Sequence, residues 1–248
     1  VVVGFLMAGG NLLLLWHPSE IVVIIGAAIG AFVTSNSLKV IKAAFGDAIG
    51  LIKPPRYNRE TYVELLKLIF DLLVKSRKEG LLAIENDISE PAKSPLFSKY
   101  PRILDDHHMT EFVVDCLRLM VGGNLDPNEL ETLLDYELET HHKEAHEPAH
   151  AVQQVADALP GFGIVAAVLG IVNTMAAVAD SSAAELGEKV GAALVGTFLG
   201  ILVAYGFVGP ISAAMKARAE EEGKAFEVVK MALVASVRGY PPPVAIEF

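Results

Sequence analysis

The sequence predicts an all-α, polytopic membrane protein with four transmembrane helices and a cytoplasmic helical domain. The 248 residues are 52% hydrophobic yet 20% charged, which indicates apolar segments joined to polar ones. Four long windows contain no Asp, Glu, Lys or Arg. The polar blocks show the apolar spacing of helices, and no strand pattern stands out.

The four uncharged windows are residues 1–19, 21–38, 158–179 and 190–215. A helix needs about 20 apolar residues to cross a bilayer, so each window predicts a membrane helix. None of them has the polar stripe that a helix on the surface of a soluble core carries. Because the chain begins with valine inside an apolar run, we expect helix 1 to be truncated in front, and we do not interpret it as a signal peptide.

The distribution of basic residues predicts the orientation. Residues 39–157 carry 14 of the 20 Lys and Arg residues, and the segment from Lys216 carries 5. Basic loops stay in the cytoplasm. We therefore expect transmembrane helices 1 and 2 in residues 1–38, a cytoplasmic helical domain in 39–157, transmembrane helices 3 and 4 in 158–215, and a cytoplasmic C-terminal helix and tail in 216–248.

Two stretches of the middle block predict helices with defined ends. The segment YVELLKLIFDLLVK has leucine and isoleucine spaced for one face, and Gly80 follows it as a stop signal. The segment DPNELETLLDYELE begins with Asp126 as a cap, Pro127 at the first helical position and Glu129 at the third. We expect the single cysteine, Cys116, to be a small buried apolar residue.

Charge and motif content exclude several classes of function. A net charge of −10 argues against a nucleic-acid partner, which would need clustered Lys and Arg. The sequence shows no phosphate-binding glycine loop and no nucleophile motif around Cys116. We expect neither an enzyme nor a cofactor.

Four histidines lie close together at His141, His142, His146 and His150. The last three would share one face if a helix continued through Pro148, and they could then bind zinc. No cysteine is near, and the acidic residues between them are typical of a solvated helix. We favour the solvated helix, and a membrane metal-binding protein that uses this cluster stays as an alternative.

Small residues are spaced for close helix packing. Gly26 and Gly30 form one G-x-x-x-G pair, and Gly196 and Gly200 form another. Such pairs let helix backbones approach one another, which favours helices packed into an assembly.

Ionisable side chains are absent from the interior of the four windows, since His17 and Asp157 lie at their edges. If the chain conducts ions, the titrating group must therefore come from another chain. Thr197 could line a path with its hydroxyl, or could hydrogen-bond within its own helix. Pro210 could kink its helix and free carbonyl groups, or could mark the exit from the membrane.

The stretch ALVGTFLGILVAYGFVGP resembles the signature of the flagellar motor stator A subunits, the MotA family. The matching positions are Ala193, Leu194, Gly196, Thr197, Phe198, Gly200, Leu202 and Pro210. ALPGFGIVAAVLGIV, which contains Pro160, is similar to the third membrane helix of the family, and SRKEGLLAIENDI to its rotor-facing loop. AGGNLLLLWHPSEIVVIIGAAIGAF is similar to its first two helices, so the resemblance covers essentially the whole chain.

The resemblance implies a function and partners. Family members form a ring, here expected to be a pentamer, around the membrane helices of a dimer of a B subunit in the bacterial inner membrane, in contact with membrane lipid. The MotB-like B subunit is anchored to peptidoglycan and supplies the carboxylate that takes and releases an ion. The ring turns a FliG-like rotor protein, and the motif match assigns this contact to Arg77 and Glu85.

The resemblance also implies residues of the ion pathway. Members that use sodium tend to carry a threonine seven residues after the proline of the third helix, and here that position is Ala167. Alanine has no side-chain oxygen for sodium, which needs several oxygen ligands. Thr197 could still orient a water or the carboxylate, and Thr174 is a further residue assigned to the ion pathway, so we expect proton coupling.

Two prolines are expected to shape the moving part. Pro160 and Pro210 each lie near a membrane boundary, where a bent helix can hold two arrangements. The nearest alternative to a flagellar stator is an energising subunit of the ExbB/TolQ type, but that family has three membrane helices rather than four.

Overall fold

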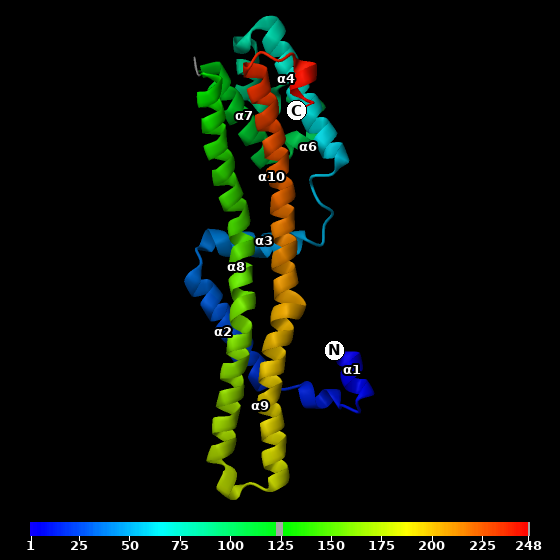
Figure 1. The fold of residues 1–248 in the computed structure, drawn as a ribbon, viewed down its shortest axis with the longest axis vertical. Coiled ribbons are helices and arrows are strands. Elements are labelled where there is room, and N and C mark those ends of the chain that lie inside the picture. Colours follow the sequence, from blue (N-terminus) through cyan, green and yellow to red (C-terminus); the bar gives the residue numbers. More distant parts are fainter. Residues whose placement is uncertain (123–125, 248) are drawn as a thin grey trace. The chain divides into compact units, whose positions relative to one another are not determined.

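The structure is a computed structural model that describes residues 1–122 and 126–247. Within these ranges every regular element is a helix and no strand occurs, which confirms the all-helical class (Figure 1). The elements are α1 (Val2–Met7), η1 (Leu12–Leu15), α2 (Pro18–Ser35), α3 (Leu38–Gly50), α4 (Arg59–Glu79), η2 (Leu81–Ile84), α5 (Glu85–Ser89), η3 (Pro91–Lys93), η4 (Phe97–Lys99), α6 (Pro101–Leu104), α7 (His107–Gly122), α8 (Pro127–Ala176), η5 (Val178–Asp180), α9 (Ala183–Val203), the π-helical turn η6 (Ala204–Val208), α10 (Gly209–Val237) and α11 (Pro242–Ala245).

The chain forms two compact units. Unit 1 contains residues 1–52 and 146–216, and unit 2 contains residues 53–145 and the chain from Ala217 on. Helices α8 and α10 contribute residues to both units. The predicted domain boundaries mark where the chain enters and leaves the membrane, whereas the two units are defined by contacts within the chain. The predicted boundaries therefore stay predictions.

Unit 1 is built around an antiparallel pair of helices. The second part of α8 is joined to α9 through η5 (Figure 1). Gly163 lies against Gly200, and Gly170 lies against Ala193, so that later residues of α8 meet earlier residues of α9. Helix α2 packs against α9 in the same unit.

Helix α2 buries one face and exposes the other. His17 precedes the helix in an extended conformation, and Pro18 begins it without losing a hydrogen bond, since the first turn has free N–H groups in any case. Residues four apart form the buried face: Glu20, Ile24 and Ala28. Val22 on the other face is 70% exposed, which suits a helix whose surroundings are apolar.

Three helical stretches of the described chain are long and apolar enough to cross a membrane: Pro18–Ser35, Pro127–Ala176 and Ala183–Val237. The predicted first crossing, residues 1–19, differs from the expectation. It folds as α1 and η1, of 6 and 4 residues, which are too short to span a bilayer. The run is interrupted at Gly9, whose φ of +81° lies in the left-handed region and ends the helical path.

Unit 2 has a large core of full-sized apolar side chains. Leu65 and Leu68 of α4 are fully buried, as are Phe97 and Leu117, and Phe112 of α7 is 1% exposed. The ring of Phe112 packs edge-on against that of Phe226 of α10, with 4.8 Å between ring centroids. This burial of branched and aromatic side chains is typical of a domain that folds in water.

The predicted helix ends in unit 2 are confirmed. Helix α4 ends at Gly80, whose φ of +92° is accessible to glycine at little cost. At the start of α8, the Asn128 N–H donates to Asp126 Oδ1 at 2.8 Å, and the Asp126 N–H donates to Glu129 Oε2 at 3.3 Å. Cys116 is buried at 1% exposure, as predicted.

Candidate functional site

Glycines bring the backbones of α8 and α9 into direct contact. A Cβ atom on Gly200 would lie 2.8 Å from the carbonyl oxygen of Leu159 and 2.9 Å from the Cα of Gly163. A Cβ atom on Gly163 would lie 2.9 Å from the carbonyl oxygen of Gly196. Because these neighbours are backbone atoms, a larger residue would push the helices apart. The Gly196–Gly200 pair singled out in the sequence therefore acts within the chain.

The other predicted glycine pair behaves differently. Gly26 and Gly30 lie on the exposed face of α2, and a Cβ atom at either position would meet nothing within 4 Å. Ile29, between them, is 57% exposed. This face of α2 is apolar and makes no contact inside the described chain.

Two predicted ion-path residues lie together at the glycine contact. Thr197 belongs to α9 and its Cα lies 3.3 Å from the Cβ position of Gly163 on α8. Ala167 belongs to α8 and its backbone nitrogen lies 3.4 Å from the Cβ position of Gly196. Among the described residues no hydrogen bond to the Thr197 hydroxyl is found, so the alternative of a bond within its own helix is not realised.

Thr174 differs from Thr197 in the state of its hydroxyl group. It lies two turns beyond Ala167 on α8 and is 1% exposed. Its Oγ1 donates to the carbonyl oxygen of Gly170 at 2.8 Å. Its proton is therefore engaged within α8, and only the oxygen lone pairs remain available to another group.

One buried carboxyl group lies next to the uncharged windows rather than inside any of them. Glu20 separates the first two windows in the sequence. In the structure it lies in the first turn of α2 and is 8% exposed. Its Oε2 atom lies 2.8 Å from the Cβ position of Gly196, and its Oε1 atom 3.6 Å from that of Gly170. The available signal was Pro18, which predicts a helix that starts before Glu20.

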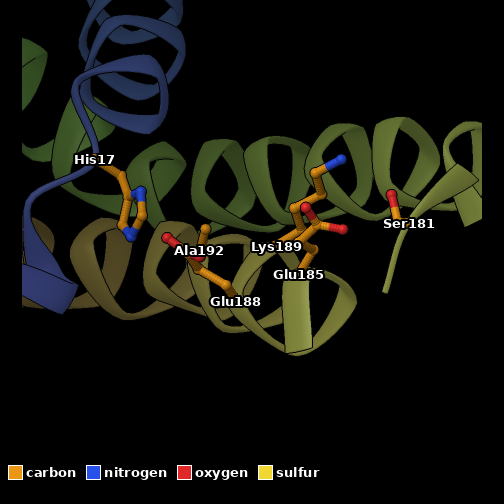
Figure 2. A pocket seen from close by; sticks show the side chains of 6 residues that line it. All are labelled: His17, Ser181, Glu185, Glu188, Lys189 and Ala192. Carbon is orange, nitrogen blue, oxygen red and sulfur yellow. The ribbon is translucent and has the colours of Figure 1, made fainter. Parts of the chain in front are cut away.

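A polar hollow of about 400 Å³ opens near the start of α2. Figure 2 shows its lining, to which α9 contributes most of the side chains. The lining residues are His17, Ser181, Glu185, Glu188, Lys189 and Ala192. Glu185 also caps the N-terminus of α9, because its carboxylate accepts a hydrogen bond from the Ser182 N–H at 2.7 Å. The hollow thus combines two carboxylates with a histidine and a lysine.

The two predicted prolines lie within helices. Pro160 is inside α8, and the carbonyl oxygen of the preceding Leu159 faces Gly200. Pro210 is the second residue of α10, directly after η6. The Gly209 N–H donates to Ala204, five residues earlier, in the π-helical pattern. Helix α9 therefore continues into α10 through a π turn, which accommodates the missing N–H of Pro210.

Arg77 and Glu85 are both exposed in unit 2, on either side of the turn at Gly80. Arg77 lies in the last turn of α4, and Glu85 begins α5. Between them Leu82 is 72% exposed. The structure therefore places two opposite charges and an apolar side chain on one short surface segment, which we call the α4–α5 turn (residues 77–85).

A buried ion pair that the sequence analysis did not identify holds this turn. Lys75 of α4 donates to Asp87 of α5 at 2.6 Å, and Asp87 is 5% exposed. The other oxygen of Asp87 accepts from the Ser94 hydroxyl at 2.6 Å. Charge-assisted bonds of this kind fix the two helices on both sides of the turn. Their spacing along the chain matches no common motif, which is why sequence reasoning missed them.

The histidine cluster does not form a metal site in the part of the chain that the structure describes, since no group of three His, Cys, Asp or Glu side chains could hold an ion there. His141 packs against aromatic rings instead. It stacks on Phe226 with 5.1 Å between centroids and meets Phe112 edge-on at 5.4 Å. The helix does continue through Pro148, as the shared histidine face required.

Family models match most of the chain. A model described as motility protein A N-terminal matches residues 1–80, and one described as the MotA/TolQ/ExbB proton channel family matches residues 105–228. Motility protein A of Salmonella typhimurium is 45% identical over 99% of this chain and 83% of its own length. Chemotaxis protein LafT of Vibrio parahaemolyticus is 42% identical over 98% of this chain and 85% of its own length.

Two solved assemblies share the fold. The C. jejuni MotAB structure aligns with a TM-score of 0.76 at 22% identity, over 98% of this chain and 86% of that one. The flagellar MotAB stator complex of Bacillus subtilis aligns with a TM-score of 0.74 at 25% identity, over 99% of this chain and 87% of that one.

Proposed function

Because this chain belongs to the motility protein A family, within the MotA/TolQ/ExbB proton channel family, we propose that it is the A subunit of a flagellar stator. It is a channel-type membrane protein, and it converts ion flow across the bacterial inner membrane into torque on the rotor. The observation that carries this proposal is the glycine contact of α8 and α9, where the backbone of Thr197 lies against Gly163 and that of Ala167 against Gly196. The relatives are motility and chemotaxis proteins, which favours a flagellar over an ExbB/TolQ-type role.

The proposed assembly explains the exposed apolar faces of unit 1. The two solved structures reported above are MotAB assemblies, which supports a B subunit as partner. We place five copies of this chain around a B-subunit dimer whose membrane carboxylate takes and releases the ion. The outward faces of α2, with Gly26 and Gly30, and of α8, with Ile164, then contact other helices or lipid.

The proposed topology has four crossings, of which three are the long apolar stretches of the structure, and the first would require residues 1–19 to form one continuous helix in place of α1 and η1. Residues 39–157 and the C-terminal segment would lie in the cytoplasm, where most of the basic residues are. The α4–α5 turn would then face the rotor, with Arg77 and Glu85 as the contact charges. Each elementary charge that crosses yields about 2.3 kcal/mol per 100 mV, so many passages drive one revolution.

The chain's own residues have distinct parts in this mechanism. Thr197, with its free hydroxyl, would orient the B-subunit carboxylate or a bridging water, and Thr174 would offer lone pairs further along α8. Ala167 leaves no oxygen for sodium, which supports proton coupling. Pro160 and the π turn before Pro210 would let α8 and α9 shift between two arrangements during rotation.

Complementation of a non-motile strain tests the proposal. The chain and its B subunit are expressed together in cells that lack other stators, and swimming speed is measured in sodium-free potassium medium with and without a protonophore. We expect swimming without sodium and its loss with the protonophore. Failure to swim in any medium, with both proteins in the membrane, contradicts the stator function. Dependence on sodium contradicts only the assignment of the proton.

A further inference from the structure

Glu20 is the one ionisable side chain that is buried in unit 1 as far as the structure describes it. It lies in the first turn of an 18-residue apolar helix, and 8% of it is exposed. Its Oε2 atom is fully buried and has no hydrogen-bond partner among the described residues. Glu20 therefore has a position that packing alone does not account for.

A structural role does not explain a carboxyl group in this place. Burying a polar group without a partner costs roughly 2–7 kcal/mol, and a charge costs more. Ionisable residues within membrane segments are rare for this reason and mark routes of ions or protons. An Ala or Leu at position 20 would fill the same face as Ile24 and Ala28 without this cost. The chain carries a carboxyl group here despite this cost.

The carboxyl group reaches the α8–α9 contact through space that glycine leaves. Its two oxygens face the Cβ positions of Gly196 and Gly170, and Ala193 lies beside Gly170. Ala166 borders the same point, 3.3 Å from the Cβ position of Gly196. All these neighbours are apolar, and Thr197 directly follows Gly196 in α9. Glu20 therefore approaches Gly196 of α9, and the next residue of that helix is Thr197, whose hydroxyl belongs to the proposed ion path.

The polar hollow lies at the start of the helix that carries Glu20. His17 lies three residues earlier, at the start of the same helix, and lines the hollow together with Glu185, Glu188 and Lys189 of α9 (Figure 2). Carboxylates and an imidazole can exchange protons with water, and the two carboxylates outweigh the single lysine of this hollow in charge. Glu20 is thus three residues from the His17 side of a polar hollow and in contact with the glycine positions of the α8–α9 pair.

We propose that Glu20 is a proton-carrying residue of the ion route, which takes a proton from the hollow and passes it to the Thr197 side of the α8–α9 contact. The inference rests on the proposed stator function and extends it with a carboxyl group from this chain. A hydrated proton binds one oxygen of the Glu20 carboxylate and neutralises it. The same proton then leaves towards the carboxylate of the B subunit, and the Glu20 carboxylate is restored.

The test measures proton flux in the complex of the full chain with its B subunit, reconstituted in vesicles with an imposed membrane potential. Glu20→Gln keeps the shape of the side chain but cannot carry a proton, so we expect an assembled complex with at least tenfold lower flux. Glu20→Asp keeps a carboxyl group and retains part of the flux. Glu111→Gln, at an exposed position of α7 in unit 2, is the matched control and keeps full flux.

The outcomes separate the two proposals. A native complex without any proton flux overturns the stator function itself. A native complex that conducts, with Glu20→Gln conducting within twofold of it, overturns only the role of Glu20. If Glu20→Gln does not assemble, treatment of the native complex with a hydrophobic carbodiimide decides, because this reagent modifies protonated carboxyl groups in apolar sites. A mass adduct on Glu20 supports the proposal, and its absence overturns it.

Discussion

The two units of this protein differ in how they place their large apolar side chains. In unit 2, Phe97 and Leu117 are fully buried, and the core consists of leucine, isoleucine, valine and phenylalanine. In unit 1, the α8–α9 contact is made by glycine and alanine, whereas Ile164 and Val172 on α8 are 56% and 60% exposed. Large side chains fill the core of unit 2, whereas many of those in unit 1 are exposed.

This difference is the one expected where lipid surrounds unit 1 and water surrounds unit 2. Water drives large apolar side chains into a core, so unit 2 gains stability from burying them. Lipid tails are as apolar as leucine, so unit 1 gains nothing by hiding isoleucine, and its helices associate through close backbone packing between small residues. One chain therefore combines burial of large apolar side chains in unit 2 with close packing of small residues in unit 1. The same kind of substitution is expected to have different effects in the two units.

The largest contrast is expected from truncation of apolar side chains. Phe112→Ala removes a ring that is 1% exposed and should destabilise unit 2 by about 3–5 kcal/mol. Ile164→Ala removes a side chain that is 56% exposed and should change stability little. Thermal unfolding of the detergent-solubilised protein, followed by circular dichroism, measures both. Equal losses would mean that Ile164 is covered by another chain in the assembly.

The next contrast concerns glycine. Gly200→Ala places a methyl group 2.8 Å from a backbone oxygen, so we expect about 1–3 kcal/mol of destabilisation and a loosened helix pair. Gly26→Ala meets nothing within 4 Å and should be neutral or slightly stabilising, because alanine favours the helix. Resistance of the complex to dissociation by detergent reports both. Loss of assembly in Gly26→Ala would show that this face of α2 packs against another subunit.

The α4–α5 turn separates stability from function within unit 2. Asp87→Asn weakens the bonds to Lys75 and Ser94 and should cost about 1–2 kcal/mol of stability. Arg77→Glu and Glu85→Lys alter exposed charges and should change stability by less than about 0.5 kcal/mol while they impair swimming. Expression, unfolding temperature and swimming speed are compared for all three. Normal swimming in both charge reversals would show that these residues do not contact the rotor.

The smallest effect is a sensitivity to alkaline pH that belongs to unit 2. Burial raises the pKa of the Cys116 thiol well above its ordinary value of 9.0. The unfolded chain therefore loses this proton first, so the contribution to stability is full below pH 9 and falls above it, by about 1 kcal/mol at pH 10. Burial and the bond to Asp71 also raise the pKa of Tyr100 to about 12, which acts in the same direction.

Unfolding measured between pH 8 and pH 10.5 checks this prediction. Cys116→Ala should flatten the pH dependence near pH 9 and leave that of the tyrosines. An unchanged slope in this variant would contradict the assignment to Cys116.

The sequence predicted the parts of the fold that depend on neighbouring residues. Gly80 as a stop and Asp126 as a cap follow from local backbone chemistry, and both were correct. The apolar windows identified α2 and the membrane parts of α8 and α9. A window records only the absence of charged residues, so it ends at Glu20 and treats residues 1–19 as one helix. In the structure, α2 already begins at Pro18, and the left-handed conformation of Gly9 interrupts the helix before it.

The candidate site was predicted only where a motif covered it. The motif around Thr197 and the spacing from Pro160 to Ala167 led to the α8–α9 contact. The contact of Gly163 with Gly200 joins residues 37 positions apart, and no local pattern contains it. The same holds for Glu20 against Gly196, because its partners are defined only once α2 packs on α9.

The π turn between α9 and α10 determines in which direction the first residues of α10 face around the helix axis. A π turn contains one residue more than the α-helical turn that it replaces, and one residue corresponds to about 100° of rotation about the helix axis. After this step Ser212 faces α8, where its hydroxyl donates to the carbonyl oxygen of Ala149 at 2.8 Å. Deletion of any one residue of Ala204–Val208 would restore a regular helix and turn Ser212 away by that angle. The number of residues in Ala204–Val208 therefore decides which side chains of α10 face α8.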